Sequence, residues 1–417
     1  MSTTRREFLA GVGCAAALSA AQSVEPNSLL RIARATDAAP TLPAKSDFSI
    51  PEGLTYINCA YTHPMPKVAA EALHDYIENR SRPDAVSKTL SKADAKSEFA
   101  ALINAKRSEI SFIPNTSTGE NLIVNALGIP NTDGNVVTDA LHFEGALLHL
   151  GELQKHNGLD LRMVMPRDWR IDIKDMERVV DRKTKLVEIS LVAMDNGFEH
   201  DLKAVCDLAH AHGAYVYADI VQAAGNTPID VRASGVDFCA CSSFKWLMGD
   251  FGLGFLFVRE DLLDRVIGRT QYGYYQAKSL ESHLLPGEAP GPVPYTWELE
   301  SDVTGHFEVG TQAIGVSQVL AHSLPYIRQI GVENIRAHRQ PMLKKLREEM
   351  PRLGYQLLTS PESTSALITF SVKDYKSVAE RLERANVNVR LGRHFLRVSP
   401  SVFNDVKDID RLLEALS

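Results

Sequence analysis

Three short apolar segments that alternate with helical patterns constrain the fold of this 417-residue chain more than any other feature. They occupy residues 186–192, 214–218 and 237–241, and an amphipathic pattern typical of a helix covers residues 201–212. Strand-like segments separated by helices indicate βαβ units and a parallel sheet with helices on its faces. The stretch therefore predicts an α/β fold.

An acid and an amine follow the second and third of these segments. Asp219 comes directly after residue 218, and Lys245 stands within Ser242-Ser243-Phe244-Lys245-Trp246. Both can lie at the carboxyl edge of one parallel sheet, where a buried amine has a lowered pKa and becomes a nucleophile toward an aldehyde. A buried carboxylate keeps a pyridinium nitrogen protonated. The pair predicts a pyridoxal 5'-phosphate (PLP) site, whereas either residue alone would more simply be a helix cap or a loop lysine.

The sequence around these residues resembles the class V aminotransferases of PLP fold type I, a family that includes cysteine desulfurases, selenocysteine lyase, kynureninase and isopenicillin N epimerase. The resemblance rests on Tyr217-Ala218-Asp219-Ile220-Val221-Gln222-Ala223, Ser242-Ser243-Phe244-Lys245 and Gly252-Leu253-Gly254-Phe255. It implies a large PLP-binding domain over residues 48–320, with a mainly parallel seven-stranded sheet between helices. A smaller C-terminal α/β domain would cover residues 321–417, with residues 48–68 packing near it.

The resemblance implies that three hydroxyl residues bind the phosphate of PLP. Thr116 and Ser117 precede a helical pattern at residues 120–127. Free N–H groups at the start of a helix favour an anion, although a simple N-cap without a ligand is the alternative. Ser242 matches the second phosphate donor of the family. Phe244 stands where family members often carry His, so one contact of the family is missing.

The ring of PLP would be held by two further residues. His142, after a predicted strand at residues 135–139, matches the position that stacks on the pyridine face and would act in catalysis with Lys245 and Asp219. A histidine of the core or of a loop is the alternative. Gln222 would hydrogen-bond the phenolic oxygen.

Thr311 ends the segment His306-Phe307-Glu308-Val309-Gly310-Thr311. This segment is similar to the one from which family members donate to the phosphate of the neighbouring protomer. The resemblance therefore implies a homodimer with shared active sites.

The carboxylate of the substrate would be bound by Arg397, because an arginine can hold a carboxylate with two parallel hydrogen bonds. Asn58 and Tyr61 match a loop at the rim of the family's active site and are either substrate neighbours or turn residues. Arg390 and Arg393 are interpreted as solvated loop charges.

Two departures from the family pattern limit the reaction. No cysteine follows Cys241, and Met194 stands where many members have Asn. Desulfurases need a thiolate before the C-terminal arginine, so a cysteine persulfide is not expected.

We expect Lys245 to remove the α proton of an amino acid or amino-acid-derived substrate, leading to transamination, epimerisation or elimination. Cleavage of C–S or C–Se bonds without a persulfide, or a catalytically idle periplasmic binding homologue, are the alternatives.

The first 21 residues have the features of a twin-arginine signal peptide. Arg5 and Arg6 precede Phe8-Leu9, and residues 10–21 carry no charge. Residues 22–47 would be a linker or an N-terminal arm. The pattern predicts a periplasmic protein exported in folded form by the twin-arginine machinery.

Composition excludes several classes of function. With 44% hydrophobic and 23% charged residues the chain is typical of a soluble globular protein, and its length fits two domains. A net charge of −7 argues against binding to nucleic acid. No apolar run after residue 25 approaches the roughly 20 residues of a membrane helix. The cysteines have no zinc-type spacing, so no metal is expected.

Overall fold

The computed structural model describes residues 42–82, 94–283 and 294–417. The predicted signal peptide at residues 1–21, and the arm up to residue 41, lie outside the described residues. Within the described ranges, no helix combines the length and the apolar character needed to cross a membrane.

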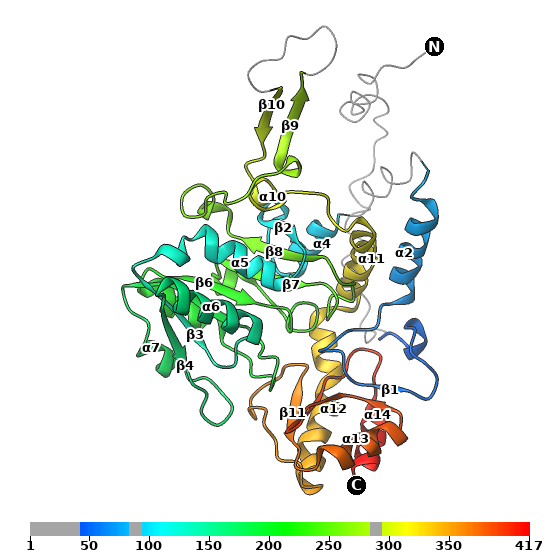
Figure 1. Ribbon diagram of the computed structural model, residues 1–417. Helices are drawn as coiled ribbons and strands as arrows, with labels where there is room; N and C mark the ends of the chain where they lie inside the picture. Colours follow the sequence, from blue (N-terminus) through cyan, green and yellow to red (C-terminus); the bar gives the residue numbers. More distant parts are fainter. Residues whose placement is uncertain (1–41, 83–93, 284–293) are drawn as a thin grey trace, which may run out of the picture. The chain divides into compact units, whose positions relative to one another are not determined.

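A seven-stranded sheet forms the centre of the fold (Figure 1). In spatial order its strands are β2 (Ile110–Ile113), β8 (Gly254–Val258), β7 (Phe238–Ser242), β6 (Tyr215–Asp219), β5 (Thr184–Ser190), β3 (Asn135–Asp139) and β4 (Asp160–Val164). Only β8 runs antiparallel to its neighbours, and the other pairs are parallel. The predicted mainly parallel seven-stranded sheet is confirmed.

The strands bury both faces because their side chains alternate between two apolar cores. Leu186 and Tyr217 join one core, and Val187 and Val216 join the other. The first core is covered by α5 (Thr116–Ala126) and α6 (Glu144–Asn157). The second is covered by α4 (Ala95–Leu102), α8 (Leu202–Ala211) and α11 (Ile314–Ile330). The sheet therefore lies between two helical layers.

The C-terminal region has its own core and a second sheet. β11 (Ile368–Ser371), β14 (Phe395–Val398) and β13 (Arg390–Leu391) pair antiparallel, and they pack with α12 (Val332–Arg352), α13 (Tyr375–Arg384) and α14 (Val406–Leu416). The N-terminal strand β1 (Thr55–Tyr56) pairs in parallel with β12 (Val387–Asn388). Residue 320, the predicted domain boundary, falls inside α11, and the boundary stays a prediction.

The segment from residue 270 to residue 304 contains a β-hairpin. β9 (Ala277–Ser282) and β10 (Tyr295–Leu299) lie side by side and pair antiparallel (Figure 1). The sequence Tyr295-Thr296-Trp297 consists of strong β-formers, which explains the strand. The remaining elements are short or peripheral: α2 (Lys67–Asn79), α7 (Ile173–Glu177), α9 (Val231–Ser234), α10 (Val303–Phe307), η2 (Lys45–Asp47), η3 (Arg107–Glu109), η4 (Ile129–Asn131), η5 (Glu260–Leu262) and η6 (Tyr274–Gln276).

Candidate active site

The acid and the amine, Asp219 and Lys245, lie at the carboxyl ends of neighbouring strands. Asp219 is the last residue of β6 and pairs in register with Ala240 of β7. Lys245 follows the end of β7 by a single turn, and the negative charge of Asp219 acts on it to raise its pKa. The acid and the amine therefore meet at the carboxyl edge of the parallel sheet.

Lys245 has the properties of a nucleophilic amine. Burial lowers the pKa of its ammonium group to about 8, against the opposing effect of Asp219. Its Nζ lies 5.8 Å from the centroid of the Phe244 ring. Among the described residues, Nζ has no hydrogen-bond acceptor and no ion-pair partner. The amine is therefore available to react with an aldehyde.

The carboxyl group of Asp219 is buried and only partly hydrogen-bonded. Its Oδ1 accepts a hydrogen bond from the backbone N–H of Val221 at 2.8 Å. Burial raises the pKa of Asp219, whereas His142 and Lys245 act to lower it. A cation placed beside it, such as a pyridinium N–H, would favour the charged form.

Two of the predicted phosphate ligands contact each other. The Thr116 N–H donates to Ser242 Oγ at 2.9 Å, and the Ser242 N–H donates to Thr116 Oγ1 at 3.0 Å. Helix α5 begins at Thr116, earlier than the predicted residue 120, because Asn115 caps it by accepting from the Thr118 N–H. Thr116 and Ser117 therefore stand in the first turn, where N–H groups and the helix dipole favour an anion.

His142 lies in the same pocket but carries a hydrogen-bond network that the sequence did not predict. One small pocket is lined by Thr116, Ser117, Glu120, His142, Phe143, Ala146, Tyr217 and Asp219. The Nδ1 atom of His142 lies 2.8 Å from Ser190 Oγ, and Nε2 lies 3.4 Å from Glu188 Oε1. Burial lowers the pKa of His142, so its imidazole is neutral near pH 7.

Gln222 is held by two protein contacts. Its Nε2 donates to the carbonyl of Ala60 at 3.1 Å, and its Oε1 accepts from Trp246 Nε1 at 2.9 Å. The amide nitrogen has two hydrogens, so one remains for a ligand. The expected contact with the phenolic oxygen stays a prediction.

Arg397 presents an incompletely paired guanidinium. It is buried on β14, and Nη1 donates to the backbone carbonyl of Met194 at 2.7 Å. Its Nε has no partner among the described residues. Burial, and secondly the charge of Arg390, lowers the pKa of Arg397 to about 10. A substrate carboxylate would satisfy both the charge and the free donor.

Arg390, interpreted as a solvated loop charge, is exposed, but it stands on strand β13 and not in a loop. Arg390 pairs in register with Arg397 on the adjacent strand, and its guanidinium carbon lies 5.8 Å from the centroid of the Tyr61 ring. Asn58 donates to Asn388 Oδ1 at 3.1 Å, and its own Oδ1 has no partner within the described chain. The hairpin of β13 and β14 brings Arg390 and Arg397 together. The alternation of side chains on either side of Gly392 could have indicated from the sequence that the two arginines share one face.

Thr311 does not join this cluster. It is exposed in the connection between α10 and α11, and its hydroxyl contacts that of Tyr274. Within the described residues it makes no hydrogen bond to Thr116 or Ser242. Its expected role toward a neighbouring protomer stays a prediction.

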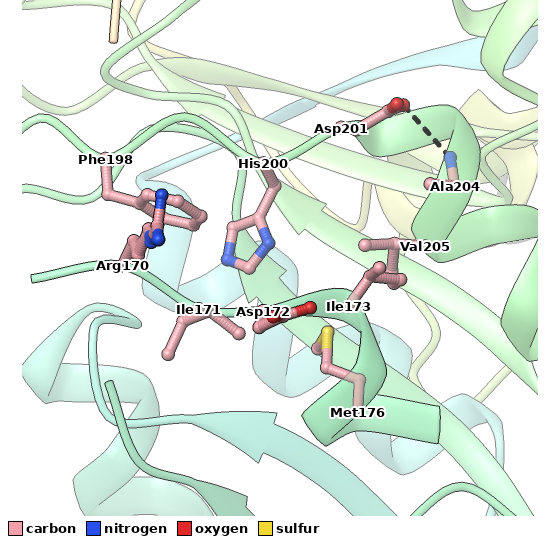
Figure 2. Close-up of a pocket in the computed structure, with 10 residues that line it drawn as sticks. All are labelled: Arg170, Ile171, Asp172, Ile173, Met176, Phe198, His200, Asp201, Ala204 and Val205. Atoms are coloured by element: carbon pink, nitrogen blue, oxygen red, sulfur yellow. Dashed lines mark hydrogen bonds between the residues drawn. The ribbon is translucent and has the colours of Figure 1, made fainter. Parts of the chain in front are cut away.

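A second pocket contains none of the predicted site residues. Figure 2 shows its lining, which comes from α7 and the loop before it, and from the start of α8 and the loop before it. His200 belongs to this lining, and its Nε2 lies 3.1 Å from Asp139 Oδ2. The pocket is therefore separate from the cluster around Lys245.

The residues at the carboxyl edge of the sheet fit PLP. They offer an amine without a partner, a buried acid on the neighbouring strand and a helix N-terminus lined by hydroxyls. Lys245 would hold the cofactor, Asp219 would face its ring nitrogen, and the first turn of α5 would bind its phosphate. The sequence analysis did not identify Glu120 or Glu188 as site residues. Glu188 could have been found, because it is a lone charged residue inside the apolar run at residues 186–192.

Comparison with known proteins agrees with this arrangement. The family model described as "Aminotransferase class-V" matches residues 56–412. A probable cysteine desulfurase of Methanothermobacter thermautotrophicus is 27% identical over 366 residues, which cover 85% of this chain and 88% of that protein.

Solved structures share the fold. The apo cysteine desulfurase of Thermococcus onnurineus NA1 superposes with a TM-score of 0.78 at 22% identity, covering 90% of this chain and 98% of that chain. The cystine C–S lyase C-DES, in complex with its reaction product cysteine persulfide, gives a TM-score of 0.75 at 19% identity, covering 88% and 97%. Because the family pattern spans most of the chain, the protein belongs to the aminotransferase class-V family of PLP-dependent α/β enzymes.

Proposed function

We propose that the protein acts on the α-amino group of an amino acid or an amino-acid-derived substrate, without forming a persulfide on a cysteine. One observation carries the proposal: the free amine of Lys245 and the unpaired Nε of Arg397 belong to one site. Their charges are coupled, because Arg397 lowers the pKa of Lys245. A nucleophilic amine beside an anion-binding arginine suits a substrate that carries both an amine and a carboxylate.

Each residue of the site has its own role in this reaction. Arg397 binds and orients the carboxylate, and Lys245 accepts the α proton as a general base. When bound, PLP supplies an electron sink for the charge left at the α-carbon. Asp219 would hold the proton of the ring nitrogen, and His142 would pack against the ring.

A persulfide on this chain would need a reactive thiol, and the described cysteines do not provide one. Cys59, Cys206, Cys239 and Cys241 are all buried, and burial raises the pKa of each thiol. The connection between β13 and β14 consists of residues 392–394, which include no cysteine. Buried thiols with raised pKa values are inert as nucleophiles.

Transamination, epimerisation and elimination all begin with removal of the α proton. A second candidate is cleavage of a C–S or C–Se bond without a protein persulfide, and the likeness to a structure described as a cystine C–S lyase supports it. Sulfide or persulfide released from cystine or cysteine would distinguish this candidate from the release of a keto acid or a change of configuration.

Homodimerisation is part of the proposal. An exposed apolar groove on the hairpin is lined by Tyr272, Tyr274, Leu280, Tyr295 and Trp297, next to Thr311. Exposed aromatic clusters of this kind favour protein contacts. Sedimentation analysis is expected to give a dimer, and an active monomer would contradict this part.

Export is also proposed, on the sequence of residues 1–21 alone. The mature protein is expected in the periplasmic fraction, and replacement of Arg5 and Arg6 by Lys is expected to retain it in the cytoplasm. Cytosolic accumulation of the wild-type full-length chain would contradict the proposal.

The deciding experiment uses purified protein loaded with PLP and pools of D- and L-amino acids, with spectral shifts and released products as readouts. Wild type is expected to respond, and Lys245→Ala is expected to lose both the protein-bound absorbance and turnover. Lys203→Ala is the matched control, because Lys203 is exposed and paired with Asp207. Binding without turnover would instead support an idle binding homologue.

A further inference from the structure

A chain of four titratable side chains runs from the protein surface to His142. Its members come from two helices on one face of the sheet, from a strand of the sheet and from the loop before one of the helices. His149 lies on α6, Glu120 on α5 and Glu188 on β5, and His142 precedes α6. None of these residues except His142 has a role in the proposed reaction.

Each member of this chain interacts with the next. His149 Nδ1 lies 2.8 Å from Glu120 Oε1. The carboxyl groups of Glu120 and Glu188 interact electrostatically, and Glu188 Oε1 lies 3.4 Å from His142 Nε2. The His142 and Glu188 side chains are fully buried, whereas 18% of the His149 side chain is exposed. One end therefore meets solvent and the other meets the candidate active site.

Two buried carboxyl groups in contact cannot both be ionised at low cost. Burial raises the pKa of both Glu188 and Glu120, and their mutual repulsion adds to this for Glu120. Among the described residues, Glu188 Oε2 has no hydrogen-bond donor. A proton on one of the two carboxyl groups would supply the missing donor, which favours a single proton shared by the pair.

The histidines at the two ends differ in charge. Hydrogen bonding to Glu120 raises the pKa of His149, which therefore carries a proton more readily than a free imidazole. His142 is neutral because of its burial. Two ionisable groups of β6, Asp219 and Tyr217, act on the pair of glutamates. Asp139 acts on His142. No other charged side chain in the described chain pairs with Glu188.

We propose that Glu120 and Glu188 share one proton and relay protons between solvent at His149 and the imidazole of His142. The inference rests on the proposed function, in which His142 packs against the reacting cofactor. Glu120, Glu188 and His149 are positioning residues, since they act only through His142.

The proton balance of one transfer closes. The O–H of Glu188 gives its proton to Nε2 of neutral His142, which leaves a carboxylate and an imidazolium beside Asp219. Glu188 regains a proton through Glu120 from the imidazolium of His149. His149 then takes a proton from solvent. No oxidant, metal or other co-reactant is required.

The first test needs no cofactor. Infrared spectra of the purified full-length chain without PLP are expected to show the carbonyl stretch of a protonated carboxyl group near pH 7, and Glu188→Gln is expected to abolish it. Glu152→Gln is the control, because Glu152 is exposed on α6 and pairs with His156. Absence of the band in wild type, or its loss only in Asp219→Asn, would overturn the inference.

The second test follows exchange of this proton with solvent. After transfer to D2O the band is expected to shift more slowly in His149→Gln than in wild type, while His156→Gln exchanges at the wild-type rate. An unchanged rate in His149→Gln would show that the pair is not linked to solvent through this residue. In the PLP-loaded protein, His149→Gln is expected to lower kcat by about tenfold or more and to leave KM unchanged.

The outcomes separate the two proposals. If the protein fails to bind PLP but shows the shared proton, the proposed function falls and the carboxyl pair stands. If PLP binds and substrates turn over but no protonated carboxyl band is found, only the relay is refuted.

Discussion

Arg397 on β14 donates from Nη1 to the backbone carbonyl of Met194 at 2.7 Å. The contact ties the C-terminal sheet to the turn that follows β5. It uses the main chain of Met194 and not its side chain. The remaining donors of the guanidinium, including the unpaired Nε, are left for a ligand.

This geometry predicts that Arg397→Lys lowers kcat/KM for an α-amino acid. Loss of one charged hydrogen bond costs about 1.5–3 kcal/mol, which corresponds to roughly 10- to 100-fold. Steady-state kinetics on any identified substrate measures the effect. Arg393→Lys, an exposed change on the same hairpin, is the control and is expected to leave the kinetics unaltered.

The pH dependence of cofactor binding reports on Lys245. Burial lowers its pKa from 10.5 to about 8, so the neutral amine becomes abundant above about pH 8. The rate at which added PLP acquires the absorbance of the bound form is therefore expected to rise with pH through this region. In Asp219→Asn the midpoint is expected to move to lower pH, because the carboxylate no longer stabilises the ammonium. A midpoint near 10.5 in wild type would contradict the assignment.

Stability is expected to fall with rising pH because of Glu188. Burial raises its pKa from 4.5 to about 8, so its stabilising contribution is complete below pH 4.5 and is lost as the pH rises through about 8. The slope is at most about 1.4 kcal/mol per pH unit for one proton. Urea unfolding midpoints across this window measure it. Glu188→Gln is expected to flatten the dependence, and Glu152→Gln to preserve it.

Alkylation tests the role of the cysteines. The described thiols are buried, so iodoacetamide is expected to leave the native protein active, with Cys59, Cys206, Cys239 and Cys241 unmodified by mass spectrometry. Unfolding before treatment is expected to expose all four. Inactivation that tracks modification of one of them would refute a mechanism without a cysteine nucleophile.

Several elements could be read from the sequence because their signals are local. Strand β3 has the predicted bounds, since it is a short apolar run that ends at polar residues. Helix α5 starts earlier than predicted because Thr116-Ser117-Thr118-Gly119 has no apolar periodicity, and the Asn115 cap that fixes its start is a structural feature.

The hairpin of β9 and β10 shows the opposite case. Its strands are separated by a sequence rich in proline and glycine, and only β10 is rich in β-formers. Pairing between Trp297 and Leu280 creates the strands, and such pairing is not encoded within either segment.

The sequence by itself determined the sheet, the acid and amine at its carboxyl edge and the family, because these depend on residue type and on order along the chain. Only the tertiary structure decided that Arg390 stands beside Arg397 and that Glu188 connects His142 to Glu120. Those pairs join residues from different elements. Their protonation follows from burial and proximity, which exist only once the helices have packed on the sheet.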